Sequence, residues 1–129
     1  YRDSIFKQNK NFIILSAKFK LDYKNKEEML NDIKENIIKR NTSQPLNYPN
    51  AGSVFRNPIG YSAGKLIEDA GLKNYHINGA YVSDKHANFI INKDNASSED
   101  IIELIEYIQK EISEKYNIKL KLEQEIIKY

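Results

Sequence analysis

The stretch from Asn50 to Lys65, NAGSVFRNPIGYSAGK, holds the residues best suited to chemistry in this sequence. It combines a hydroxyl (Ser53), a guanidinium (Arg56) and an amide (Asn57) with glycines and a proline that are too dense for a regular helix or strand. It is also too varied in chemistry for a flexible linker, which would be rich in Gly and Ser or in charge. We therefore predict a tight polar turn that presents these three side chains to a ligand, with an anion as the main candidate.

The glycines and the lysine of this stretch also suggest a phosphate-binding P-loop, but the spacing excludes it. A P-loop needs four residues between its first glycine and the Gly-Lys pair, which is then followed by Ser or Thr to bind magnesium. Here Gly60 and Gly64 enclose three residues, and Lys65 is followed by Leu66. An anion that binds here must be held by a different arrangement.

A zinc site and a hydrolase nucleophile do not fit either. His76 and His86 lack the HExxH spacing and a third clustered ligand, and the chain has no cysteine, so we expect no bound metal. Ser53 lies in GSVF rather than in the GxSxG turn of hydrolases. Judged alone, His86 is more typical of a surface or hydrogen-bonded histidine, and Glu125 of a solvated carboxylate on the outer face of a strand.

The first part of the chain is predicted to contain one strand and one helix. Residues 11–23 are β-branched and aromatic and then alternate, which predicts a strand. A helix is predicted over residues 25–40, with Asn25 as its N-cap and acidic residues in its first turn. Its apolar stripe consists of Met29, Leu30, Ile33, Ile37 and Ile38. Residues 41–52 are rich in turn-forming residues and separate this unit from the next.

The second part mixes short strands with two helices. A short helix fits residues 62–70, with Gly71 as its C-terminal stop. Residues 74–97 are predicted to form two short strands joined by an irregular loop, and Ser97 and Ser98 open the longest helix. The predicted buried face of that helix consists of Ile101, Ile102, Leu104, Ile105, Ile108, Ile112 and Tyr116. Residues 117–127 alternate as a final strand, with Ile118, Leu120, Leu122 and Ile126 on one face and Lys119, Lys121, Glu123 and Glu125 on the other. Since no regular βαβ alternation occurs, we predict an α+β fold with an antiparallel or mixed sheet and packed helices.

Composition indicates one ordinary globular domain. The chain has 129 residues, of which 40% are hydrophobic and 29% charged, and no apolar run approaches the roughly 20 residues of a membrane span. The absence of cysteine excludes a disulfide framework and suits a cytoplasmic protein. The first residue is Tyr1 rather than Met, so we expect the chain to be part of a longer protein.

The net charge of +2 conceals a basic N-terminal region. Seven basic residues stand among the first 26, against two acidic ones, and such an arm can bind nucleic acid. No aromatic stacking pattern or known nucleic-acid-binding motif accompanies them, so we favour a solvated strand face and expect no nucleic-acid partner.

Four segments together resemble the UDP-N-acetylenolpyruvoylglucosamine reductase family. In family order they are YRDSIF (1–6), YPNAGSVFRNP (48–58), AGKLIEDAGLKNYHINGAYVSDKHANFIINKDNA (63–96) and LEQEII (122–127). The resemblance spans nearly the whole chain, and the Gly-Ser-x-Phe-x-Asn-Pro block is its most specific part. The short connection over residues 58–64 resembles the shorter, type II-like branch of the family.

The resemblance implies a C-terminal piece of a cytoplasmic flavoenzyme. Such an enzyme uses NADPH and FAD to reduce UDP-N-acetylglucosamine enolpyruvate to UDP-N-acetylmuramate for peptidoglycan. Residues 1–45 would be the tail of the second FAD-binding lobe, and residues 46–129 the substrate-binding domain. Most of the FAD site would lie outside this chain, so we expect the chain alone to be inactive, and we expect a monomer.

The resemblance also assigns roles to individual residues. Ser53 matches the family's proton donor, Glu125 a glutamate that assists at the same centre, and Arg2 a segment that reaches the active site. Asn57 matches a substrate-contacting position, and Gly52 with Ser53 lies next to the cofactor. The remaining candidates for binding substrate phosphate or carboxylate are Arg56, Lys65, Ser83 and His86. From the residues alone, Arg2 is equally well explained by pairing with Asp3.

One alternative from a different functional class stays open. The chain can also be a non-catalytic module that binds a nucleotide sugar or another polyanion. A flavin-binding lobe upstream of Tyr1 would favour the reductase, whereas a reading frame that truly begins near Tyr1 would favour the binding module.

Overall fold

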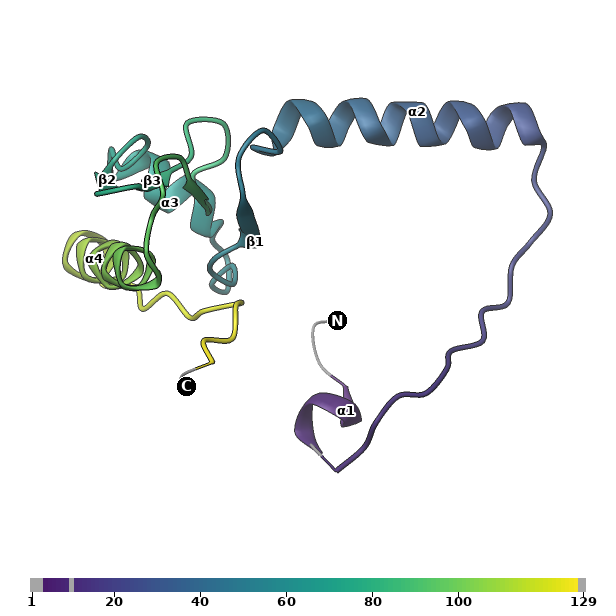
Figure 1. Cartoon of the computed structure of the whole chain (residues 1–129), viewed down its shortest axis with the longest axis horizontal. Helices are drawn as coiled ribbons and strands as arrows, with labels where there is room; N and C mark the ends of the chain where they lie inside the picture. The colour runs from purple at the N-terminus through teal and green to yellow at the C-terminus, as the bar shows by residue number, and fades with distance from the viewer. Residues whose placement is uncertain (1–3, 10, 128–129) are drawn as a thin grey trace. The chain divides into compact units, whose positions relative to one another are not determined.

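The computed structural model of the chain contains a four-stranded antiparallel sheet with strand order β1-β4-β3-β2 (Figure 1). Of the candidate residues, Gly52 and Ser53 lie on this sheet. The structure describes residues 4–9 and 11–127. The strands are β1 (Asn50–Ser53), β2 (His76–Ile77), β3 (Ala80–Val82) and β4 (Phe89–Asn92). The helices are α1 (Ile5–Gln8), α2 (Lys26–Ser43), α3 (Ala63–Asp69) and α4 (Ser98–Tyr116). Helices packed with an antiparallel sheet confirm the predicted α+β class.

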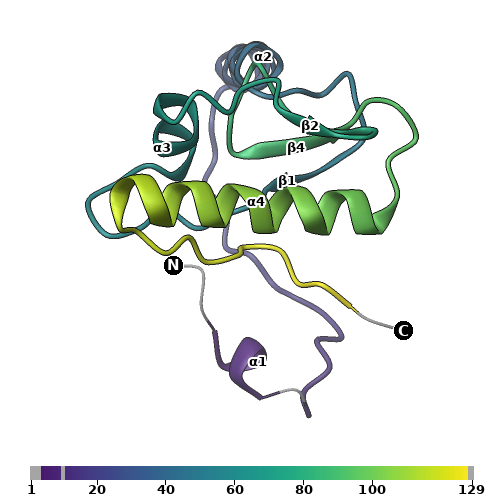
Figure 2. The same ribbon diagram turned by 90° about the vertical axis from the view of Figure 1, so that its left-hand side faces the viewer.

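The longest helix, α4, covers one face of the sheet and begins where the sequence predicts. Ser97 is its N-cap, and a capping box joins Ser97 to Asp100, which satisfies two backbone N–H groups of the first turn. Figure 2 shows α4 running across in front of the strands. Its predicted face is buried at Leu104, Ile105, Ile108 and Ile112, which join side chains from β3 and α3 in one core.

The other predicted helix of this region, α3, is also confirmed. Ser62 is its N-cap, and its hydroxyl accepts a hydrogen bond from the Lys65 N–H. The helix ends at Gly71, whose φ of 81° is a left-handed conformation that glycine adopts without strain.

Residues 74–97 contain three strands where two were predicted. The extra strand arises because β2 and β3 form a tight hairpin around Asn78 and Gly79, with His76 opposite Tyr81. Asn78 has a φ of 46°, a positive value at the first central residue of this two-residue turn. The hairpin was missed because its strands have only two and three residues, too few to show an alternating pattern.

The predicted strand at residues 117–127 is wrong. Among the described residues this segment forms a single antiparallel bridge, between Phe55 and Leu122. The predicted apolar face is nevertheless confirmed up to Leu122, because Leu120 is buried and Ile118 and Leu122 pack against the core. Ile126 is exposed. The segment is also held to α4, because the side chain of Gln109 donates a hydrogen bond to the Leu120 carbonyl (2.8 Å). In a sheet, that carbonyl would accept from a neighbouring strand.

The chain divides into two units, Tyr1–Ile33 and Lys34–Tyr129, and the sheet belongs to the second. In the first unit, the strand predicted at residues 11–23 is wrong: within the described chain no strand falls before β1. The N-cap prediction is confirmed, because the Asn25 side chain accepts from the Glu27 N–H at 2.8 Å. The helix continues past the predicted end at residue 40 to Ser43. Its apolar stripe is exposed.

None of the helices in the described part of the chain has the length and apolarity that crossing a bilayer requires.

Candidate functional site

Ser53 is the last residue of β1, an edge strand of the sheet. It pairs with Phe89 of β4 across a register shift that lies between Asn50 and Ser53. Gly52, with a φ of 80°, makes the bend that this irregularity needs, and apart from its chain neighbours no atom lies within 4 Å of where its Cβ would stand. Ser53 is therefore carried by a bent strand end, and the residue before it borders open space.

The loop after Ser53 is irregular but firmly anchored. Val54 and Phe55 are buried, and the Val54 N–H donates to the Asn88 carbonyl (2.9 Å). The Asn88 side chain makes two bonds to Phe55, accepting from its N–H (3.0 Å) and donating to its carbonyl (2.8 Å). The predicted irregular turn is confirmed only after Ser53, and it is wrong for Asn50–Ser53, which form strand β1. The loop is held because its backbone groups bond to Asn88 and to the C-terminal segment.

The C-terminal segment brings Glu123, rather than Glu125, to this loop. The Glu123 N–H donates to the Val54 carbonyl (2.8 Å), one residue from Ser53. Its side chain is three-quarters buried and one carboxylate oxygen lies 3.3 Å from Nε of Arg56. Glu125 is exposed. The sequence does not single out Glu123, because alternation places both glutamates on the same outer face and the resemblance matches Glu125.

Asn57 and Arg56 line one hollow of about 330 Å³. The hollow is completed by Pro58, Ile59, Lys119 and Lys121. The Asn57 side-chain oxygen accepts from the Ala63 N–H (3.0 Å), which ties the loop to the start of α3 and leaves the amide NH2 as the donor. Three cations against the single carboxylate of Glu123 make this hollow attractive to an anion.

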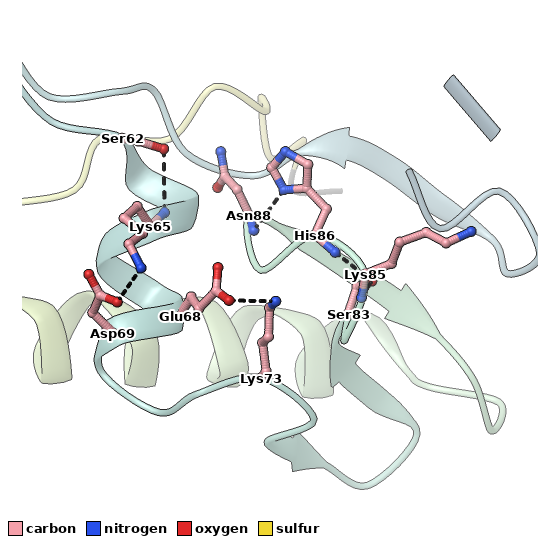
Figure 3. A network of polar contacts seen from close by, with 9 residues as sticks. All are labelled: Ser62, Lys65, Glu68, Asp69, Lys73, Ser83, Lys85, His86 and Asn88. Atoms are coloured by element: carbon pink, nitrogen blue, oxygen red, sulfur yellow. Dashed lines mark hydrogen bonds and ion pairs between the residues drawn. The ribbon is translucent and has the colours of Figure 1, made fainter. Parts of the chain in front are cut away.

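Lys65 and His86 line a second, polar hollow of about 240 Å³ (Figure 3). Lys73 and Lys85 add two further cations to it, and Glu68 one carboxylate. Lys65 pairs with Asp69 (2.7 Å), which raises the lysine pKa through that hydrogen bond and its charge. Lys73 pairs with Glu68 (2.8 Å), and this bond lowers the pKa of the Glu68 carboxyl. The ammonium of Lys85 instead donates to a carbonyl, that of Asn41 (2.9 Å), so this bond leaves its positive charge uncompensated.

Ser83 supports the second hollow indirectly, through the turn that carries Lys85 and His86. It is fully buried, and its hydroxyl accepts from the backbone N–H groups of Lys85 (3.1 Å) and His86 (3.3 Å). It therefore shapes the turn that carries His86 rather than facing the hollow.

The structure thus gathers the predicted residues into two neighbouring groups. Asn57 and Arg56 belong to the first hollow, Lys65 and His86 to the second, and Asn57 links them because it binds the residue that begins α3. Ser53 lines neither hollow: it precedes Arg56 by three residues, and it pairs with Phe89, three residues after His86. Arg2 lies outside the described residues. Lys73, Lys85 and Asn88 were missed, and neither a motif nor a spacing in the sequence singled them out.

The sequence pattern of the family described as "UDP-N-acetylenolpyruvoylglucosamine reductase, C-terminal domain" matches residues 44–127. A relative named UDP-N-acetylenolpyruvoylglucosamine reductase from Fervidobacterium nodosum is 51% identical over 129 residues, which is 99% of this chain and 42% of the relative. A relative of the same name from Caldanaerobacter subterraneus subsp. tengcongensis is 51% identical over 127 residues, with 98% and 42% covered. The chain therefore spans about two fifths of the length of these curated relatives.

The fold comparison agrees with the sequence comparison. The crystal structure of UDP-N-acetylenolpyruvylglucosamine reductase from Thermus caldophilus superposes with a TM-score of 0.68 at 38% identity. The match covers 82% of this chain and 37% of that structure.

Proposed function

Because the chain belongs to the UDP-N-acetylenolpyruvoylglucosamine reductase family, we propose that it is the C-terminal, substrate-binding part of an enzyme that converts UDP-N-acetylglucosamine enolpyruvate to UDP-N-acetylmuramate. In this proposal NADPH is the reductant, FAD is the cofactor and the product enters peptidoglycan synthesis. Residues 46–129 form the substrate-binding domain, and residues 1–45 belong to the second FAD-binding lobe. A cytoplasmic location and a monomeric state remain predictions.

The described residues fit one edge of a flavin site. Gly52 offers bare backbone beside open space at the end of an edge strand, where a planar group can approach closely. Gly52 and Ser53 would line that edge, and the rest of the site would be supplied by the part of the longer enzyme that this chain does not span. When bound, FAD supplies hydride to the enolpyruvyl group of the substrate.

The two cationic hollows suit the charged parts of the substrate. A nucleotide-sugar diphosphate needs positive charge and N–H donors, which Arg56, Asn57 and His86 provide from loops and Lys65 from α3. Lys85 and Lys121, which the sequence did not single out, also line the hollows and add positive charge. Their task is to bind and orient the substrate over Ser53.

Ser53 is the proposed proton donor. Hydride addition at the β-carbon pushes negative charge toward the α-carbon and its carboxylate, and this centre then takes a proton. An unaided hydroxyl is a weak acid, so a neighbouring carboxylate is needed to orient it or to relay its proton. The resemblance assigns that supporting role to Glu125. Glu123 is the competing candidate, because its backbone N–H binds the Val54 carbonyl next to Ser53, although its carboxylate lies beside Arg56. The observation that best supports the proposal is that the loop directly after Ser53 carries Arg56 and Asn57 into one cationic hollow.

A chimaera tests the proposal in a complete enzyme. The matching segment of the Fervidobacterium nodosum relative is replaced by this chain, and NADPH-dependent formation of UDP-N-acetylmuramate is measured. Ser53→Ala should lower kcat by about 10²- to 10⁴-fold, the usual contribution of a general acid, with KM little changed. Activity that survives Ser53→Ala within a few fold would contradict its role.

The two glutamates are compared in the same chimaera. Glu125→Gln should lower kcat by at least about tenfold, whereas Glu123→Gln, its matched control two residues away, should leave kcat within about twofold. The opposite result would transfer the role to Glu123. A chimaera that binds substrate but shows no reduction would favour the non-catalytic binding module.

A further inference from the structure

Asn88 is a buried polar residue that no step above uses, and it makes contacts in two directions. Its side chain is 4% exposed. Toward the Ser53 loop it binds both backbone groups of Phe55, and its carbonyl accepts from Val54. Toward the second hollow its N–H donates to Nδ1 of His86 (3.2 Å; Figure 3). Burying an amide costs free energy unless it is fully bonded, and here every polar atom of the side chain has a partner.

The side chain of Asn88 replaces a missing piece of sheet. The register between β1 and β4 shifts before Ser53, and neither strand continues to Phe55. The Asn88 carboxamide uses its oxygen as acceptor and one N–H of its NH2 group as donor, so it binds both backbone groups of Phe55 as a paired strand residue would. The loop that follows Ser53 is thereby fixed to the loop that precedes β4.

The backbone of Asn88 also determines which nitrogen of His86 carries the proton. A backbone N–H can only donate, so Nδ1 of His86 must accept and therefore lacks a proton. The proton of the neutral ring is then on Nε2, which makes Nε2–H a donor. The ring has little freedom to turn, because Gly64 lies beneath it: a Cβ there would stand 3.2 Å from Cε1 of His86. Phe89 packs against the ring, with centroids 4.8 Å apart.

We propose that Asn88 is a positioning residue that joins the Ser53 loop to His86 and holds His86 in the Nε2–H form, so that the ring donates a hydrogen bond to an anionic oxygen in the second hollow. The inference that His86 donates to an anion rests on the proposed substrate site. The inference about the His86 tautomer rests only on its contact with the Asn88 N–H. Asn88 itself needs no contact with the ligand. Its effect on binding passes through the direction of the His86 donor and the fixed distance between the two loops.

His76 provides an internal reference for the tautomer in the same molecule. Its Nδ1 lies 3.3 Å from the Asn78 carbonyl, which can only accept, so this nitrogen must carry a proton. Ring nitrogen NMR shifts of the full chain at about pH 8, where ordinary histidines are neutral, should therefore show opposite tautomers for the two rings. A wild-type His86 with its proton on Nδ1 would overturn the inference without any substitution.

Substitution of Asn88 tests the link between the loops, with Asn92 as a matched control. Asn92 lies four residues away and also binds two backbone groups, the N–H and the carbonyl of Ala96. Asn88→Ala should speed amide exchange at Phe55, mix the His86 tautomers and weaken binding of UDP, used as the probe, by about tenfold. Asn92→Ala removes a similar number of hydrogen bonds. It should nevertheless leave the amide exchange at Phe55, the His86 tautomer and the affinity for UDP as in the wild type. Unchanged His86 shifts in folded Asn88→Ala would refute the positioning role.

A second variant covers the case in which Asn88→Ala fails to fold. Asn88→Asp keeps the acceptor for the Phe55 N–H and loses the donor to its carbonyl, so it should show the same changes in weaker form. Wild-type tautomers as predicted, together with no UDP binding by any variant, would contradict the proposed substrate site and leave the role of Asn88 standing. UDP binding that persists in Asn88→Ala with mixed tautomers would contradict the ligand part of the inference.

Discussion

Asn57 shows how a single side chain can serve folding and binding at once. Its oxygen accepts the Ala63 N–H and helps to start α3, while its NH2 group remains a donor beside Arg56, Lys119 and Lys121. The two functions use different atoms of one amide, so they can be separated by substitution.

Asn57→Asp should separate them. The carboxylate keeps the acceptor for Ala63, so the free energy of unfolding should change by less than about 0.5 kcal/mol. It replaces the donor by a negative oxygen, so UDP affinity should fall by at least about tenfold. Thermal unfolding and calorimetric titration measure the two effects. Asn57→Ala removes both the acceptor and the donor, so it should lower the free energy of unfolding as well as the affinity for UDP. If Asn57→Asp binds UDP as tightly as the wild type, Asn57 is not part of the binding site.

At the scale of elements, the N-terminus of α4 is tied to the β2–β3 hairpin through Asp100. Its carboxylate accepts from the Asn78 side chain (2.7 Å) and from the Ser97 N–H (2.8 Å). These bonds favour the charged form, so they lower the pKa of Asp100, chiefly through Asn78. The helix cap and the hairpin turn therefore stabilise each other.

The pH dependence of stability follows from this shift. Because the folded pKa of Asp100 is depressed, its contribution is complete above the ordinary value of 3.8 and is lost as pH falls through the lower, folded pKa. Asp100→Asn should be less stable than the wild type at pH 7, and the difference should shrink below about pH 4. Denaturant unfolding at several pH values measures it. A difference that stays constant down to pH 2 would show that the carboxylate charge does not matter.

Gly79 is the most constrained position of the same hairpin. A Cβ there would lie 2.1 Å from the Asp94 carbonyl oxygen, so Gly79→Ala must displace backbone and should cost about 3 kcal/mol of unfolding free energy, the upper end for overpacking. Gly71 is the control: nothing lies within 4 Å, and only its φ of 81° opposes a side chain, so Gly71→Ala should cost about 1 kcal/mol. Equal losses in the two variants would contradict the close approach at Gly79.

At the scale of the whole molecule, the hydrophobic core belongs entirely to the second unit. Its buried members run from Val54 to Leu120, with Leu122 packed against them, and the family match covers residues 44–127. None of the described residues of the first unit, 4–9 and 11–33, belongs to this core.

Deletion of residues 1–33 should therefore leave the second unit folded. Its free energy of unfolding should change by less than about 1 kcal/mol, as for changes away from a core. Leu120→Ala in the same shortened chain should cost about 2–5 kcal/mol, because Leu120 is 4% exposed. Circular dichroism during denaturation measures both. A shortened chain that does not fold would show that the two units depend on each other.

The sequence by itself determined the features that depend on local chemistry. Asn25 and Ser97 act as helix N-caps because their side chains bond to N–H groups two or three residues away. Gly71 ends α3 because of its own backbone freedom, and the buried face of α4 follows from a spacing within one helix. The Gly-Ser-x-Phe-x-Asn-Pro block was enough to identify the family for the same reason: its residues stand together in the chain.

Tertiary structure decided everything that needs a distant partner. Residues 117–127 alternate like a strand, but a strand exists only where another segment accepts its hydrogen bonds, and here one bridge to Phe55 is all that forms among the described residues. Alternation likewise cannot distinguish Glu123 from Glu125. Only the contacts with Val54 and Arg56, some 70 positions earlier, bury the first and leave the second exposed. The same holds for Asn88, whose amide acquires a role because the chain folds Phe55 against it.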